Sequence, residues 1–351
     1  MSDELYMKRC LELAAMGNGQ VSPNPMVGCV IVKDGKIIGE GYHQHYGQSH
    51  AEVNAVNSVI KAYGDLAPSL LKGATAYVSL EPCAHFGKTP PCADLLVHHQ
   101  LAKVVIGNKD PFADVDGKGI AKLKTAGIEV ITGVLEDECY QLNRRFFTRI
   151  KKQRPYIILK WARTANGYFA PKNTLQQWIS GPLAKVLVHK WRSEEDAILI
   201  GKQTAIADNP QLSAREWPGS SPIRLLIDRN LEVPADAEIF NSVAKTVIFN
   251  EQKTDVINNI HYIQMEDMQY YLPQKIAFQL YLMDIQSVII ESGANILNQF
   301  ITAGLWDEAR VFSSASSWDT GIHSPLINGK ITSVNQLGHD QLTIYETYTN
   351  K

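Results

Sequence analysis

Residues 80–92 read LEPCAHFGKTPPC, and the triplet HAE occupies residues 50–52, about thirty residues earlier. The two stretches supply three candidate zinc ligands, His50, Cys83 and Cys92, and a candidate proton carrier, Glu52. A neutral imidazole and two thiolates fill three corners of a tetrahedron and leave the fourth for water, which separates a catalytic zinc from a closed structural one. Such a water becomes hydroxide near neutral pH, and a carboxylate that does not bind the metal can carry its proton to a departing amine. These residues predict a hydrolytic deaminase.

The spacing of the candidate residues suits such a site. Residues 51–61 are predicted to form a helix with His50 and Glu52 at its start, and residues two apart do not share a helix face. One side chain can therefore bind the metal while the other approaches from another side. Cys83 and Cys92 each follow a proline, a context typical of helix starts, where backbone N–H groups and the helix dipole favour the thiolate.

The loop between the two cysteines is longer than in the commoner deaminase pattern, in which two residues separate them. Here it spans residues 84–91, and its His85 and Lys88 are candidates for contact with a substrate. Two alternatives stay open at this point. His43, His45 or His85 could complete a structural zinc site, or the cysteines could be small buried side chains that bind nothing.

Composition argues against several other classes of protein. The chain has 351 residues, 45% hydrophobic and 20% charged, which is ordinary usage for two domains with full cores. Its formal net charge of −2 argues against a nucleic-acid surface, no apolar run approaches the ~20 residues of a membrane span, and the acidic start does not resemble a signal sequence. We therefore expect a cytoplasmic enzyme for small molecules, without nucleic-acid or membrane partners. Cys10, Cys29 and Cys139 are expected to be buried thiols.

The order of the predicted elements indicates two α/β domains. In the first half, strands are expected at residues 27–32, 37–42, 74–79, 103–106 and 128–132, and helices at 4–16, 51–61, 93–99 and 120–125. Asp34-Gly35 predicts a tight hairpin between the first two strands, and the alternation that follows predicts a layered sheet. A strand at 156–162 begins a second series. We place the boundary near 147–154, with domains at 1–148 and 149–351.

In the second half, the candidate residues are scattered polar side chains at the ends of predicted strands. Glu291 follows the apolar strand at 288–290 and precedes a turn of small residues that opens a helix, which is a natural site for cofactor phosphates. Lys160, Arg192 and Trp178 are further candidates. By default, Lys160 and Arg192 would be solvated surface charges and Trp178 would be a core or edge aromatic.

With these motifs the chain resembles the bifunctional riboflavin-biosynthesis enzymes, which join a diaminohydroxyphosphoribosylaminopyrimidine deaminase to a 5-amino-6-(5-phosphoribosylamino)uracil reductase. The resemblance spans nearly the whole chain and is stronger in the first half. It rests on residues 22–28 (SPNPMVG), 41–43 (GYH), 50–52 (HAE), 80–92, 160–162 (KWA), 178–180 (WIS), 191–192 (WR), 196–201 (DAILIG), 207–210 (ADNP) and 291–293 (ESG).

For the first domain, the resemblance implies the three-layer fold of cytidine deaminases. Its zinc ligands fall on His50, Cys83 and Cys92 and its proton carrier on Glu52, in agreement with the chemistry above. Contacts to a pyrimidine ribotide substrate would be made by an amide, two imidazoles, an ammonium and a carboxylate, namely Asn24, His43, His85, Lys88 and Asp110.

For the second domain, the resemblance implies an α/β fold like that of dihydrofolate reductase, which uses NADPH to reduce the ribosyl group to a ribityl chain. Cofactor contacts would fall on Arg163, Trp178, Thr204, Asp208, Gly293, Ala294, Asn295, Ile296 and Leu297. Substrate contacts would fall on Lys160, Gln176, Arg192, Leu212, Arg215 and Glu291. The family also suggests a homo-oligomer, either a dimer or a tetramer.

Three positions of the second domain depart from the family pattern. Asn166 replaces an aspartate, Gln176 stands where serine is common, and Lys185 replaces a frequent arginine. They support a second hypothesis, an active deaminase whose second domain only binds nucleotide or mediates assembly. Other rivals are a nucleic-acid deaminase, which needs a basic groove, and a non-catalytic zinc scaffold in which Glu52 is dispensable.

Overall fold

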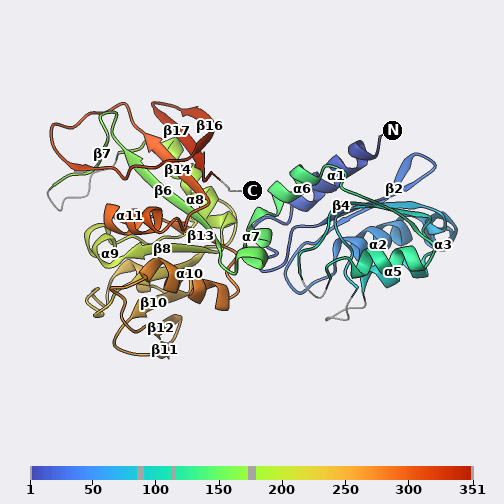
Figure 1. Ribbon diagram of the computed structural model, residues 1–351, viewed down its shortest axis with the longest axis horizontal. Coiled ribbons are helices and arrows are strands. Elements are labelled where there is room, and N and C mark those ends of the chain that lie inside the picture. The colour runs from blue at the N-terminus through green and yellow to red at the C-terminus, as the bar shows by residue number, and fades with distance from the viewer. Residues whose placement is uncertain (1, 85–90, 113–114, 173–178, 349–351) are drawn as a thin grey trace. The chain divides into compact units, whose positions relative to one another are not determined.

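A computed structural model describes residues 2–84, 91–112, 115–172 and 179–348. The chain separates into two compact units, Met1–Gln153 and Arg154–Lys351 (Figure 1). The expected boundary after residue 148 falls inside helix α7 (Arg144–Lys152). Phe146 and Phe147 of this helix pack on Leu80, so the whole helix belongs to the first unit. Among the described residues, none of the helices has the length and apolar character that a bilayer crossing requires.

The first unit is built on a five-stranded sheet with the order β2-β1-β3-β4-β5. Only the β1–β2 and β1–β3 pairs are antiparallel. Asp34 and Gly35 both have positive φ, 50° and 74°, as the predicted tight hairpin between β1 and β2 requires. The strands are β1 (Gly28–Lys33), β2 (Lys36–Tyr42), β3 (Thr75–Leu80), β4 (Lys103–Asn108) and β5 (Glu129–Thr132).

Helices cover both faces of this sheet, and the expected three-layer architecture is confirmed. Apolar residues of α1 and α6 pack on one face, and those of α2, α4 and α5 pack on the other. The central strands are therefore buried on both sides and read as continuous apolar runs. The helical segments before α7 are α1 (Asp3–Ala15), α2 (Ala51–Tyr63), η1 (Gly64–Leu66), α3 (Ala67–Leu71), α4 (Cys92–His98), α5 (Lys118–Thr125) and α6 (Glu136–Leu142).

The second unit is built on a ten-stranded sheet with the order β11-β12-β10-β9-β8-β13-β6-β14-β17-β16. The strands from β12 to β14 run parallel, whereas β11, β17 and β16 pair antiparallel with their neighbours. A separate pair joins β7 to β15. The strands are β6 (Tyr156–Arg163), β7 (Tyr168–Ala170), β8 (Ala197–Gly201), β9 (Ile223–Ile227), β10 (Thr246–Asn250), β11 (Asp255–Ile257), β12 (Ile260–Gln264), β13 (Ser287–Ile290), β14 (Glu308–Ser313), β15 (Ile322–His323), β16 (Lys330–Leu337) and β17 (Asp340–Glu346).

Helices also cover both faces of the larger sheet (Figure 1). Helices α10 (Leu272–Leu282) and α11 (Ala294–Thr302) pack on one face. Helices α8 (Pro182–Glu194) and α9 (Lys202–Asp208) pack on the other, near the short η2 (Glu238–Phe240). A parallel sheet between two helical layers brings the carboxyl ends of its strands to one edge, where such folds bind ligands.

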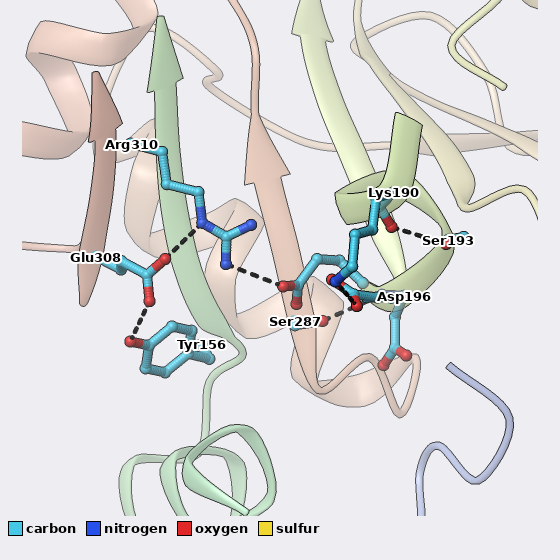
Figure 2. Close-up of polar contacts among 9 residues, drawn as sticks. Tyr156, Lys190, Ser193, Asp196, Ser287, Glu308 and Arg310 are labelled. Atoms are coloured by element: carbon cyan, nitrogen blue, oxygen red, sulfur yellow. Dashed lines mark hydrogen bonds and ion pairs between the residues drawn. The ribbon is translucent and has the colours of Figure 1, made fainter. Parts of the chain in front are cut away.

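The amino-terminal ends of β6 and β14 carry a buried ionic network (Figure 2). Arg310 donates hydrogen bonds to Glu308 and to Glu195, and Tyr156 donates one to Glu308 at 3.2 Å. The Arg310 guanidinium also lies 4.5 Å from the centre of the Trp191 ring. Each buried charge has a partner of opposite sign, which offsets the desolvation cost of burying it. The contact with Glu195, directly after α8, links that helix to the sheet.

Candidate active sites

The predicted metal ligands converge in the first unit. His50 is the N-cap of α2, Cys83 follows strand β3, and Cys92 begins α4. The Nδ1 atom of His50 lies 3.6 Å from Cys83 Sγ and 3.4 Å from Cys92 Sγ, and the three ligand atoms all lie within 4.8 Å of one another. A tetrahedral zinc with bonds of about 2.0 Å to nitrogen and 2.3 Å to sulfur holds those atoms about 3.5 Å apart. The distances from His50 to the two sulfur atoms therefore match those of a tetrahedral zinc site.

The two cysteines are electrostatically prepared for a cation. The hydrogen bond from Cys92 and a further one with His50 lower the pKa of Cys83 to about 4, although burial opposes the shift. The same interaction with Cys83, together with burial, raises the pKa of Cys92. Cys83 therefore ionises readily, whereas Cys92 stays protonated while no cation is present. A cation in contact with both sulfur atoms would stabilise the Cys92 thiolate as well.

Glu52 lies beside this cluster as the second residue of α2 and is only 3% exposed. Burial raises the pKa of its carboxyl, and the neighbouring Cys83 adds to the effect. A carboxyl whose pKa lies closer to neutrality can both accept and return a proton during one catalytic cycle. The environment of Glu52 therefore suits the predicted proton carrier.

Asn24 and His43 are brought together by the loops that flank β1 and β2. The Nδ1 atom of His43 lies 3.1 Å from the carbonyl oxygen of Ser49, and its Nε2 atom lies 3.1 Å from Asn24 Nδ2. A carbonyl only accepts, so Nδ1 carries the hydrogen and Nε2 accepts from the amide. Both ring nitrogens of His43 are thus engaged, and among the described residues neither His43 nor the exposed His45 joins the metal group. His85 and Lys88 lie outside the described residues.

Asp110 follows β4 and is held by a residue that the sequence analysis did not single out. Glu81, 4% exposed, accepts backbone N–H groups of Asp110, Gly117 and Ile120 at 3.1–3.3 Å. It stands two residues before Cys83, so it ties the Asp110 loop to the metal-binding segment. Burial raises the pKa of Asp110 to about 6. The sequence signals for Glu81 were its place in the motif at residues 80–92 and its position directly after an apolar strand.

In the second unit, three predicted substrate residues form one buried ionic cluster. Glu291 follows β13, Lys160 lies in β6, and Arg192 lies near the end of α8. The Glu291 carboxylate accepts from Lys160 Nζ at 3.4 Å and from Arg192 Nη2 at 3.0 Å. Burial opposes the ionisation of Glu291, but the two cations outweigh it and hold its pKa at about 2. The cluster therefore carries a net positive charge.

The other predicted substrate residues lie at different distances from this cluster. Arg192 Nη1 also reaches the carbonyl of Ser213 at 3.5 Å, beside the buried Leu212. Arg215, in the same loop, is exposed. Gln176 and the predicted cofactor residue Trp178 lie outside the described residues.

The predicted cofactor edge forms where β8 and β13 end side by side. The hydroxyl of Ser292 accepts the N–H of Gly201 at 3.0 Å, and a Cβ at Gly201 would lie 2.4 Å from Ile296 Cδ1. Helix α11 begins directly after Gly293, and no side chain among the described residues caps it. Thr204 Oγ1 lies 3.9 Å from the Cβ position of Gly293. Uncapped N–H groups next to a hydroxyl fit a cofactor phosphate.

Two further predicted cofactor residues lie on neighbouring elements. Asp208 ends α9, and burial raises the pKa of its carboxyl. Arg163 ends β6 and donates to Ser313 Oγ at 3.1 Å. Arg163 therefore stands at the same carboxyl edge of the sheet as Gly201 and Glu291.

The structure gives a physical reason for one departure from the family pattern. Asn166 accepts the N–H of Trp318 at 3.2 Å and donates to the carbonyl of Trp318 at 2.7 Å. An aspartate could not make the second contact, because a carboxylate has no hydrogen to donate. Lys185 pairs with Glu216 at 2.6 Å.

Comparison with known proteins gives the same division of the chain. The family model described as "Cytidine and deoxycytidylate deaminase zinc-binding region" matches residues 1–108, and that described as "RibD C-terminal domain" matches residues 155–315. The riboflavin biosynthesis protein RibD of Aquifex aeolicus (strain VF5) is 37% identical over 99% of each chain. The RibD protein of Escherichia coli (strain K12) is 37% identical over 89% of this chain and 87% of its own length.

Solved structures agree over the full length. A diaminohydroxyphosphoribosylaminopyrimidine deaminase/5-amino-6-(5-phosphoribosylamino)uracil reductase from Thermotoga maritima matches with a TM-score of 0.89 at 35% identity, over 98% of each chain. RibD of Acinetobacter baumannii (form 1) matches with a TM-score of 0.89 at 32% identity, over 99% of each chain. The deaminase-like fold expected for the first half and the dihydrofolate-reductase-like fold expected for the second are confirmed. The chain therefore belongs to the RibD family of riboflavin biosynthesis proteins, which carry a zinc-binding deaminase domain and an NADPH-dependent reductase domain.

Proposed function

We propose that this chain performs two consecutive reactions on one ribotide. It deaminates 2,5-diamino-6-(5-phosphoribosylamino)pyrimidin-4(3H)-one to 5-amino-6-(5-phosphoribosylamino)uracil and then reduces the ribosyl group of that product to a ribityl chain. The observation that carries the proposal is the convergence of His50, Cys83 and Cys92 beside the buried Glu52, with nitrogen–sulfur distances of 3.6 Å and 3.4 Å that suit a tetrahedral zinc. We assign deamination to the first unit, Met1–Gln153, and reduction to the second, Arg154–Lys351.

In the deamination, His50, Cys83 and Cys92 would hold the metal and Glu52 would move the proton. When bound there, zinc would supply the nucleophile by lowering the pKa of a water to about 7. The Glu52 carboxylate accepts a proton from the attacking water and returns it to the departing amine, which leaves as ammonia. The raised pKa of Glu52 supports this double role.

Substrate binding in this half falls to the loops around the metal cluster. Asn24 and His43 approach from the segments before β1 and after β2, and Asp110 approaches from the loop after β4. Their amide, imidazole and carboxyl groups suit the edge of a pyrimidine and the hydroxyls of ribose. His85 and Lys88, in the loop between the cysteines, complete the proposed set, with Lys88 on the phosphate.

In the reduction, the ionic cluster orients the substrate against the cofactor. NADPH supplies the hydride. Lys160, Arg192 and Glu291 together carry a net positive charge, which supports our proposal that they bind the phosphate-bearing ribosyl part of the substrate. The remaining proposed substrate contacts are Gln176, Leu212 and Arg215, and the proposed cofactor contacts are Arg163, Trp178, Thr204, Asp208 and residues 293–297.

NADPH oxidation by the zinc-loaded enzyme, started with the diaminopyrimidinone ribotide, tests both halves together. We expect wild type to release ammonia and oxidise NADPH. Glu52→Gln should do neither with this substrate, yet it should oxidise NADPH when given the aminouracil ribotide. Ammonia release without NADPH oxidation in wild type would instead support a reductase-like domain that only binds nucleotide or mediates assembly.

We further propose a cytoplasmic homo-oligomer, either a dimer or a tetramer. All five cysteines are unpaired, and ligating thiolates persist in a reducing compartment. The edge strand β16 exposes Ile331 and Val334, and an exposed apolar edge favours pairing with another chain. Light scattering of the purified protein tests the assembly, and a monomer at micromolar concentration would contradict it.

A further inference from the structure

We propose that Asn54 is a positioning residue for the deaminase. It closes the loop between β2 and α2 and, through His43, fixes the orientation of the Asn24 amide. The inference rests on the proposed function in one respect, namely that Asn24 and His43 contact the substrate. Asn54 itself touches neither the candidate metal ligands' sulfur atoms nor Glu52 in any hydrogen bond of the described residues.

The position of Asn54 follows from the packing of α2 on the sheet. Its backbone N–H donates to the carbonyl of His50 at 3.1 Å, one helical turn earlier. Strand β2 approaches this turn closely, since a Cβ at Gly41 would lie 2.3 Å from Ala55 N and 2.5 Å from Ala51 O. The close approach places the Asn54 side chain between the two ends of the loop formed by residues 43–48.

The Asn54 amide holds both ends of that loop. Its Nδ2 atom donates to the carbonyl of Tyr42 at 2.8 Å and to the carbonyl of Ser49 at 3.3 Å. Both acceptors are carbonyls, so they fix which end of the amide faces them, and both amide hydrogens are used. One side chain therefore connects the last residue of β2 to the residue before His50.

The carbonyl of Ser49 is shared with His43. It accepts from Asn54 Nδ2 and from His43 Nδ1, the second at 3.1 Å. With its hydrogen on Nδ1, His43 presents a lone pair on Nε2, and Asn24 Nδ2 donates to it at 3.1 Å. The Ser49 carbonyl thus determines the tautomer of His43, and the lone pair on His43 Nε2 orients the Asn24 amide with its oxygen away from His43.

These contacts give Asn54 an effect on the proposed substrate-binding residues but not on the metal ligands' sulfur atoms or Glu52. Without Asn54, the Ser49 carbonyl loses one of the two donors that the described residues give it, and the contact that aligns the His43 ring with the Asn24 amide is weakened. His50, Cys83, Cys92 and Glu52 keep their own contacts. We therefore expect weaker substrate binding at an almost unchanged turnover rate.

Asn54→Ala and the isosteric Asn54→Asp, which cannot donate, test the inference in the zinc-loaded full chain. Both should raise the KM for deamination about tenfold, the equivalent of one or two lost hydrogen bonds, with kcat within about twofold. Zinc content and NADPH oxidation with the aminouracil ribotide should stay at wild-type values. A KM within twofold of wild type in both variants would overturn the inference.

Ser58→Ala is the matched control on the same helix. Ser58 Oγ accepts the N–H of Glu40 at 2.9 Å and donates to the carbonyl of Ala55 at 2.7 Å. It therefore also links α2 to β2, but away from the loop. We expect a similar loss of thermal stability with no change in KM. An equal rise in KM in Ser58→Ala would assign the Asn54 effect to general loosening and overturn the inference.

Two measurements keep this inference distinct from the proposed function. His43→Ala and Asn24→Ala should each raise KM, and the effect of Asn54→Ala should be less than additive with that of Asn24→Ala, because both act on one contact. Unchanged KM in His43→Ala and Asn24→Ala would remove the substrate contacts of the proposed function. Nitrogen NMR of the wild type should show His43 protonated at Nδ1, and the opposite tautomer would overturn the inference even if the variants do not fold.

Discussion

The two candidate active sites are assembled in opposite ways. The metal ligands and Glu52 of the first lie within residues 50–92, at the starts of helices α2 and α4 and just after strand β3. Those of the second come from β6, α8 and the end of β13, with Lys160 and Glu291 separated by 131 residues. Metal ligands are rare residue types in a recognisable spacing, whereas lysine, arginine and glutamate occur on every surface. A metal site can therefore be recognised from its motif, and an ionic cluster only from the register of the strands that carry it.

The two central glutamates sharpen this comparison. Burial beside Cys83 raises the pKa of Glu52, whereas Lys160 and Arg192 overcome burial and hold the pKa of Glu291 at about 2. The first carboxyl is prepared to exchange a proton, and the second is prepared to stay charged. One residue type thus has an environment suited to the proposed acid–base group in one unit and an environment that favours a permanent anion in the other.

Loss of a metal ligand should have the largest effect. Cys83→Ser should release zinc and abolish measurable deamination, because the serine hydroxyl does not replace a thiolate at neutral pH. NADPH oxidation with the aminouracil ribotide should continue. Metal analysis and the two separate assays check this, with Cys10→Ser, a buried thiol outside the cluster, as the control. Loss of both activities in folded Cys83→Ser would contradict independent sites.

Glu52→Gln should have the next largest effect on the same site. The amide keeps the shape of the side chain but cannot carry a proton, so kcat for deamination should fall by about 10²–10⁴-fold. Zinc content should stay near that of wild type, because Glu52 is not a ligand in the proposal. Single-turnover ammonia release checks the rate, and an undiminished rate would remove Glu52 from the mechanism.

Glu291→Gln should affect the ionic cluster of the second unit. Leaving two buried cations without their anion should cost about 3–5 kcal/mol of unfolding free energy and raise the KM for reduction, with deamination unaffected. The folded pKa of Glu291, about 2, lies below its ordinary value of 4.5. Its contribution to stability is therefore complete above pH 4.5 and is lost as the pH falls toward 2.

Denaturant unfolding of the second unit between pH 6 and pH 2 tests this pH dependence. The difference between wild type and Glu291→Gln should shrink steadily below pH 4.5. Asp255→Asn is the matched control. Asp255 begins the exposed strand β11 and forms a surface ion pair with Lys253. Surface pairs contribute about 0–1 kcal/mol. A difference that stays constant down to pH 2 would contradict the ionised state assigned to Glu291.

The smallest effect is expected for Glu81→Gln. The glutamine keeps one acceptor oxygen but turns an NH₂ group toward backbone donors, so the change should cost about 1–3 kcal/mol and weaken deamination through the Asp110 loop. Thermal unfolding and the KM for deamination check this. Glu129, an exposed glutamate at 3.8 Å from Lys103, is the control position. A variant with unchanged stability and unchanged KM would show that the Asp110 loop keeps its conformation without the Glu81 carboxylate.

Most of the first unit could be predicted from local patterns. The expected strand at residues 74–79 is β3 (Thr75–Leu80), and the expected helix at 93–99 is α4 (Cys92–His98). Apolar periodicity and turn residues act over a few positions and can be read from them directly. Glu81 and Asn54 could not be predicted in this way, because they bind backbone groups. Every residue offers such groups, so their partners depend on the path of the loop.

The sequence by itself determined the residue types that can do chemistry and the alternation of strands and helices. The triplet at residues 50–52 and the two cysteines specified a zinc deaminase, since few other combinations leave a metal position open to water. The tertiary structure alone decided which charges meet. Strand register placed Glu291 between Lys160 and Arg192, and the path of the loop before α2 placed the Ser49 carbonyl against His43 Nδ1. Those contacts depend on distances between segments remote in sequence, which packing of the whole chain sets.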